Sequence, residues 1–173
     1  MTLELIHTFD DKNYRHFLNG FNIVLHCHHY MSLTTKLAED FDAIGGTRIL
    51  AETAEDTIRP ILDNYAKTHA IAAGDARLKM AAEFFSVMGM GKMEASGTAG
   101  SGNVTLTRSH VDQGWVKKWG NHTKPINHFT RGFIAAMFAA AYDKPARSYT
   151  VSETDAIVTG KPAGSFTVTA QGA

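Results

Sequence analysis

The chain has 173 residues, 44% of them hydrophobic, and its 17 Lys and Arg residues balance 17 Asp and Glu residues. This length and apolar content suit one globular domain, residues 1–173, with a substantial core. Zero formal net charge gives no basic excess to attract nucleic acid or anionic lipid, so we expect neither as a partner. The single cysteine cannot form an intramolecular disulfide, and the N-terminus lacks a signal peptide's basic start and apolar block. We therefore expect a cytoplasmic protein.

The first half of the chain reads as a strand followed by three helices. Residues 20–27, "GFNIVLHC", are rich in β-forming residue types, and a helix is predicted directly after them. Its apolar residues recur at three- and four-residue spacings: Met31, Leu33, Leu37 and Phe41. Gly45-Gly46 ends it, and in the next helix, up to Tyr65, Pro60 should cause a kink or a restart. A third helix is predicted over 75–91.

The second half predicts two β-hairpins and an apolar helix. Residues 103–111 alternate as a half-buried strand does, and residues 92–96 are its expected hairpin partner. A short amphipathic turn or helix over 111–120 follows. Residues 127–142, "NHFTRGFIAAMFAAAY", predict a central helix packed on a sheet, too short in its apolar run to span a bilayer. Residues 147–158 and 164–170 predict a closing hairpin.

Three histidines and the only cysteine adjoin one another as His26-Cys27-His28-His29, at the predicted junction of strand and helix. On an extended segment His26 and His28 share a face, whereas on a helical turn His26 and His29 do. Either pair could bind a metal ion or the polar group of a ligand. The alternative is that the cluster reflects a histidine-rich composition, with one ring exposed and another bonded to a backbone carbonyl.

A pocket of aromatic and imidazole groups is the second candidate feature. Trp115 and Trp119 lie at i, i+4, and further histidines follow them in sequence. If the strand continues through Cys27, then Ile23, Leu25 and Cys27 face the core. We therefore expect His26 and at least one of His28 and His29 to border the main cavity, near His128 or a tryptophan. The expected ligand-binding residues are His26, His28, His29, Trp115, Trp119, His128 and Phe129.

The segment "ETDAIVTGKPAGSF" carries Glu153, Ala156, Gly160, Gly164 and Phe166. At this spacing, and together with the helix over 127–142 and "FFSVMGMGKMEA" (84–95), it resembles the 4-vinyl reductase domain family, which also supplies the sensor domains of aromatic-responsive activators. The resemblance covers about half the chain. It implies an α/β (α+β) fold in which a mainly antiparallel sheet and helices surround a largely apolar cavity, usually in a homodimer. In aromatic-sensing members, the glutamate and two cysteines hold zinc, whereas here Ala156 and Gly164 replace the cysteines.

These observations lead to three hypotheses. The first is a domain that binds a small, largely apolar or aromatic molecule, as a sensor or carrier does. The second is a histidine-dependent enzyme acting on a small hydrophobic molecule, with iron, zinc or haem bound through histidine. Its metal candidates are His26, His28, His128 and Glu153, while no motif assigns a catalytic residue. The third is a dimeric structural or assembly module.

Overall fold

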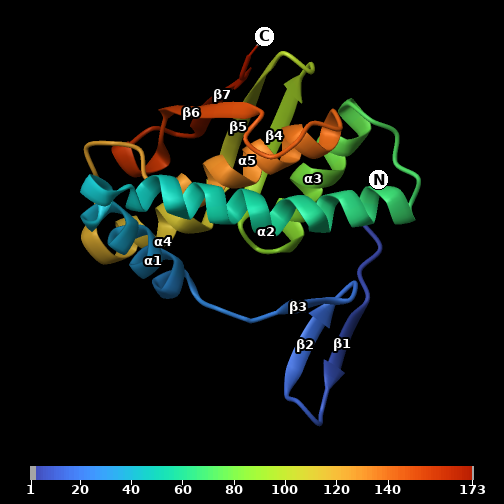
Figure 1. Cartoon of the computed structure of the whole chain (residues 1–173). Coiled ribbons are helices and arrows are strands. Elements are labelled where there is room, and N and C mark those ends of the chain that lie inside the picture. The colour runs from blue at the N-terminus through green and yellow to red at the C-terminus, as the bar shows by residue number, and fades with distance from the viewer. Residues whose placement is uncertain (1–2, 173) are drawn as a thin grey trace.

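The computed structural model describes residues 3–172, which form two antiparallel sheets and five α-helices (Figure 1). The N-terminal sheet contains β1 (His7–Asp10), β2 (Arg15–Leu18) and β3 (Phe21–Ile23). The main sheet has the order β4-β5-β7-β6, with β4 (Gly91–Gly97), β5 (Ser101–Ser109), β6 (Tyr149–Asp155) and β7 (Gly164–Ala170). The α-helices are α1 (His28–Asp40), α2 (Gly46–Thr68), α3 (Asp75–Val87), α4 (His110–Trp119) and α5 (His128–Ala141). Two 3-10 helices are η1 (Asp42–Ile44) and η2 (Ile157–Thr159).

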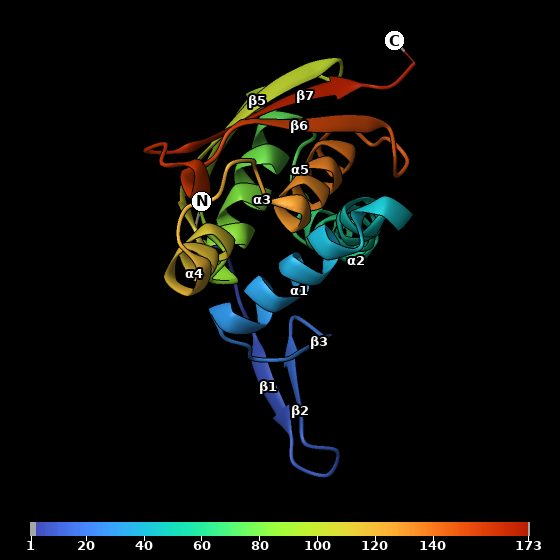
Figure 2. The ribbon, with the colours of Figure 1, turned by 90° about the vertical axis from the view of Figure 1, so that its left-hand side faces the viewer.

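Helix α5 lies at the centre because it is apolar on nearly every side. The main sheet covers one side of it and α2 the other, with α3 beside it (Figure 2). Gly132 allows the close approach of α5 to α2, since a Cβ atom there would lie 2.0 Å from the backbone oxygen of Ala51. Every residue of α5 from Gly132 to Ala141 is buried. The helix is thus fixed between two layers.

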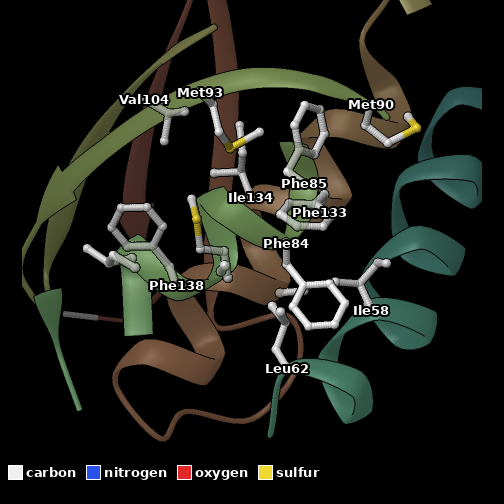
Figure 3. Close-up of a cluster of buried hydrophobic side chains, with 14 of the residues drawn as sticks. Ile58, Leu62, Phe84, Phe85, Met90, Met93, Val104, Phe133, Ile134 and Phe138 are labelled. Carbon is white, nitrogen blue, oxygen red and sulfur yellow. The ribbon is translucent and has the colours of Figure 1, made fainter. Parts of the chain in front are cut away.

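The core joins α2, α3, α5 and the inner face of the main sheet. Fully buried aromatic rings from two helices meet here, with Phe85 and Phe133 packed edge to face at 4.9 Å between centroids (Figure 3). Phe138 packs against the hairpin of β4 and β5, where a Cβ atom on Gly102 would lie 2.3 Å from its ring. Side chains therefore fill the space between the sheet and α5.

Three sequence predictions are confirmed. The fold is of the α+β class, a helix begins at His28, and both predicted hairpins form in the main sheet. Helix α4 also forms where the amphipathic pattern predicts it. Across residues 3–172, none of the helices combines the length and the apolar character that crossing a bilayer requires.

Two expectations about the first half of the chain are wrong, and two strands there were not predicted. Helix α2 runs through Pro60 without interruption, because Pro60 is exposed and water can satisfy the carbonyl that lacks its helical donor. The strand predicted over 20–27 ends at Ile23, so Leu25 and Cys27 do not face the core and are exposed. Strands β1 and β2 come from a segment for which no strand was predicted.

The apolar pattern of α1 predicts the helix but does not mark its buried face. The helix forms as expected, but of its four patterned apolar residues only Met31 is buried. Leu33 and Leu37 are about half exposed, and so is Phe41 at the C-terminal cap. The reason is that α1 contacts α2 and α4 through its other side, which carries Ser32, Thr35 and Ala38.

Candidate functional site

An apolar pocket of about 270 Å³ lies between the N-terminal segment and helices α2, α3 and α5. Its lining is almost wholly hydrophobic, which is typical of sites for small organic molecules. The lining residues are Leu18, Phe21, Ile23, Val24, Leu25, His26, Ile58, Ile61, Phe84, Val87, Met88, Met90 and Phe129. We call this the apolar pocket.

Two different kinds of structure form its walls. Helices α2 and α3 present residues at helical spacing, such as Ile58 and Ile61, and these elements are anchored in the core. The opposite wall is the chain from β2 to the start of α1, in which Val24 is 78% exposed and Leu25 is 79% exposed. One wall is therefore rigid, whereas the other is held by few contacts and has room to move.

His26 supplies the titratable side chain of the apolar pocket. Its Nδ1 atom lies 3.3 Å from the backbone oxygen of Cys27, and the side chain is exposed at the margin of the pocket. Phe129, in the first turn of α5, lines the same pocket. Of the residues expected from sequence to bind a ligand, these two are brought together there.

The other histidines at the start of α1, His28 and His29, form a cluster with His110 of α4, which also adjoins His26. The ring of His28 lies 4.2 Å from that of His29 and 6.1 Å from that of His110, and His26 lies 5.8 Å from His110. Burial lowers the pKa of His28 and that of His110, and the neighbouring imidazoles lower both further. The Nε2 atoms of His28 and His110 are buried without a hydrogen-bond partner. Both rings therefore favour the neutral state.

His128 lies elsewhere, in a polar pocket lined by residues of α1, α5 and the loop before α5. It is buried between Glu39 and Arg131, which bond its two ring nitrogens. Arg131 can only donate, so Nδ1 accepts and Nε2 carries the proton given to Glu39. Burial lowers the pKa of His128, against the raising effect of the Glu39 hydrogen bond. Lys124 completes the cluster, with its Nζ atom 2.5 Å from Glu39.

Glu153 also lines the polar pocket, but its carboxylate is bonded by Asn127 at the N-terminus of α5. Asn127 in turn donates to Asp112 at 2.8 Å, and Asp112 accepts from the backbone nitrogen of Val158 at 2.8 Å. Burial raises the pKa of Glu153 to about 7, and the nearby charge of Asp112 also raises it. This buried network ties α4, α5, β6 and η2 together.

As the missing cysteines predict, the residues at this place do not fit the zinc site that the resemblance gives to aromatic-sensing members. Ala156 and Gly164 offer no side-chain donor, and both oxygens of Glu153 already accept hydrogen bonds from Asn127. A single carboxylate does not make the four-coordinate site that zinc prefers. The amide of Asn127 satisfies the carboxylate instead.

The structure separates the metal candidates proposed from the sequence. His26 borders the apolar pocket and, like His28, adjoins His110, whereas His128 and Glu153 are at the polar pocket. Among residues 3–172, no three His, Cys, Asp or Glu side chains gather in an arrangement that could hold a metal ion. The metal candidates do not form one centre because α1 keeps them apart. His26 and His28 lie at its start, whereas His128 bonds Glu39 near its end.

The two tryptophans form a further, separate cluster. Trp115 is buried, its ring lies 4.8 Å from that of Trp119 and 5.1 Å from that of His122, and neither tryptophan lines the apolar pocket. The lining residues Phe21, Ile58 and Ile61 were not predicted as a site. The apolar residues among positions 18–25 are the sequence signal for one wall of the pocket.

No protein-family model matches this sequence, and no curated protein matches it either. Among solved structures, the chain is similar to the crystal structure of the phenol-responsive sensory domain of the transcription activator PoxR with phenol. The TM-score is 0.75 at 15% sequence identity, covering 95% of this chain and 84% of that chain. At this identity the likeness establishes the shared fold.

Proposed function

We propose that this chain is a small-molecule-binding domain of the sensor type, whose ligand occupies the apolar pocket. The observation that carries the proposal is the pocket itself, an apolar space of about 270 Å³ with His26 as its titratable group. A cavity of about 150 Å³ already holds benzene in another protein, so a molecule of one or two rings suits this volume. The fold shared with a sensory domain agrees with such a role.

The composition of the pocket supports a ligand class. Apolar walls favour a largely hydrophobic or aromatic molecule, because its transfer from water releases about 25 cal/mol per Å² of buried apolar surface. The imidazole of His26 would bond one polar group at the margin and so orient the molecule. The ring centroid of His110 lies 5.8 Å from that of His26.

The division of the pocket into a rigid and a weakly held wall supports sensing over catalysis. A ligand that touches both walls would order the chain from Leu18 to His26, which leads directly into α1. Ligand binding would thereby make the segment from Leu18 to His26 more ordered, and this change would reach the surface of the molecule. No nucleophile or catalytic pair lines the pocket among the described residues.

Toluene and phenol, used as probes in ligand-observed NMR, test this proposal. We expect both to bind the wild-type protein, and we expect Ile61→Trp to weaken both at least tenfold because the larger side chain fills the apolar pocket. His26→Ala should weaken phenol binding while leaving toluene binding unchanged. Ile49→Trp, on the same helix but outside the pocket, is the matched control. Failure of both probes to bind, or equal binding by Ile61→Trp, would contradict the proposal.

A further inference from the structure

The segment between β3 and α1, residues 24–27, belongs to the weakly held wall of the apolar pocket, and we call it the β3–α1 linker (Figure 1). It has no regular secondary structure, and all four of its residues are exposed. Val24, Leu25 and His26 line the pocket. At its start, the linker follows β3, an edge strand of the small N-terminal sheet. Its position therefore depends on the contacts at its other end, where α1 begins.

Four histidines gather at that end, and we call them the imidazole cluster: His26, His28, His29 and His110. The ring centroid of His28 lies 4.2 Å from that of His29 and 6.1 Å from that of His110. The centroids of His26 and His110 are 5.8 Å apart. The start of α1 packs closely on α4, because a Cβ atom on Gly114 would lie 2.9 Å from the backbone oxygen of His28. The imidazole cluster thus connects the linker, α1 and α4.

The surroundings of the imidazole cluster disfavour a positive charge. His28 is the first residue of α1 and His110 is the first residue of α4, so the positive ends of two helix dipoles lie beside these rings. The first turn of α1 contains no acidic residue. The Nε2 atoms of both rings are buried without a hydrogen-bond partner among the described residues. Neutral rings therefore suit the compact arrangement, and imidazolium rings do not.

The titration of the two helix-starting histidines agrees with this geometry. Burial lowers the pKa of His28, and the positive charges of His29 and Lys117 lower it further. Burial also lowers the pKa of His110, as do the two nearest rings of the imidazole cluster, against the raising effect of a hydrogen bond with the Cys27 backbone. Both groups consequently take up a proton more readily once the compact arrangement opens.

The charged side chains on the neighbouring elements do not neutralise the imidazole cluster. Asp112, in the first turn of α4, instead accepts hydrogen bonds from Asn127 and from the backbone nitrogen of Val158. Arg108, near the end of β5, donates to the backbone oxygen of Thr107. Within residues 3–172, the histidine that forms an ion pair with a carboxylate is the one in the polar pocket, outside the imidazole cluster. A proton taken up here therefore remains without a counter-charge.

We propose that the imidazole cluster is an acid-sensitive switch: its neutral rings hold the β3–α1 linker in place, and protonation below about pH 6 separates the start of α1 from α4 and releases the linker. Like charges on rings this close repel one another. The closed arrangement binds fewer protons than the released one, so it is fully favoured above the ordinary imidazole pKa of about 6.5 and is lost as the pH falls below it.

Release of the linker displaces three residues that line the apolar pocket, and the switch thereby regulates access to it. This consequence rests on the proposed function, whereas the movement itself does not. The two are tested separately, because the movement of the linker is measured without any ligand.

A nitroxide label on the full chain measures the movement. Cys27 is the only cysteine, is exposed and lies in the linker, so it can be labelled directly. A ring that is neutral in the closed arrangement shifts the equilibrium toward release by up to about tenfold for each pH unit below 6.5. We expect the ratio of mobile to immobile label to rise about tenfold between about pH 7.5 and about pH 5.5. A label on Thr167→Cys in a Cys27→Ser background, exposed on β7, should not respond.

Replacing His28 and His110 together by Phe removes the titrating groups and keeps a planar ring, without loss of a hydrogen bond at Nε2. We expect the label in this double variant to stay immobile at both pH values. Replacing both by Leu repeats the test with smaller side chains if the phenyl rings do not fit. His69→Phe, at the exposed C-terminal cap of α2, is the matched control and should respond as the wild-type protein does.

Circular dichroism at both pH values verifies that each labelled protein is folded. A wild-type label that does not respond to pH would overturn the switch. So would an undiminished response after both histidines are replaced, or an equal response of the label at position 167, which would show that acid loosens the whole fold.

Discussion

Asn127 holds both carboxylate oxygens of Glu153: its Nδ2 atom lies 2.7 Å from Oε1 and its backbone nitrogen lies 3.1 Å from Oε2. The same side chain donates to Asp112. Two acidic groups from β6 and α4 are thereby joined at the N-terminus of α5. The family resemblance implies a metal ion at the position of Glu153, whereas here Asn127 bonds the carboxylate.

Replacement of Asn127 by Ala should destabilise the fold by about 2–4 kcal/mol, because Asp112 and Glu153, both largely buried, each lose the hydrogen bond from its side-chain amide. Urea denaturation followed by circular dichroism measures this change. Asn103→Ala, at an exposed position of β5, should change the unfolding free energy by less than about 0.5 kcal/mol. Equal stability of Asn127→Ala and the wild-type protein would show that the network contributes nothing.

The raised pKa of Glu153 predicts a pH dependence of stability. The folded protein holds the proton up to about pH 7, whereas an ordinary glutamate releases it near 4.5, so the folded state binds more protons between these values. This contribution is fully present below pH 4.5 and is lost as the pH rises through 7, up to about 3 kcal/mol.

Comparison with Glu153→Gln isolates this effect from that of other groups, because glutamine does not titrate. We expect the free energy of unfolding of the wild-type protein, relative to the variant, to fall between pH 5 and pH 8. Guanidinium denaturation at both pH values gives the difference. A relative stability that stays constant or rises over this range would contradict the assigned pKa direction.

Gly132→Ala should destabilise the contact between α2 and α5. The added Cβ atom would lie 2.0 Å from the backbone oxygen of Ala51 and 2.9 Å from the Cβ atom of Ala54, so one helix must move. We expect a loss of roughly 1–3 kcal/mol in thermal or urea unfolding. Gly100→Ala is the control, since its new Cβ atom would meet only the Thr98 hydroxyl at 3.9 Å. A similar effect of both substitutions would refute the close helix contact.

The elements of the main body were predictable because their patterns are local. Helix α5 is apolar on nearly all sides, and only a position between two layers buries such a helix, as the structure confirms. The hairpins of the main sheet follow from alternation and turn residues in the same way. The apolar residues Leu33 and Leu37 of α1 also have helical spacing, so the sequence predicts the helix but not whether these side chains meet the core.

The candidate site was predictable only in part. His26 and Phe129, 103 positions apart in the numbering, meet at the apolar pocket, although nothing in their local sequence connects them. His28 points away from it because α1 begins at that residue and turns successive side chains by about 100°. His128 bonds Glu39, which is 89 positions away in the numbering, so no local pattern predicts the pairing.

The sequence by itself determined the class of fold, the central helix and the place where strand gives way to helix, since periodicity and turn chemistry act between near neighbours in the chain. Only the tertiary structure decided how the histidines divide among the apolar pocket, the cluster with His110 and the polar pocket. It also decided which apolar face stays uncovered. Those outcomes depend on the packing of elements distant in sequence, where burial and hydrogen bonding compete among many possible partners.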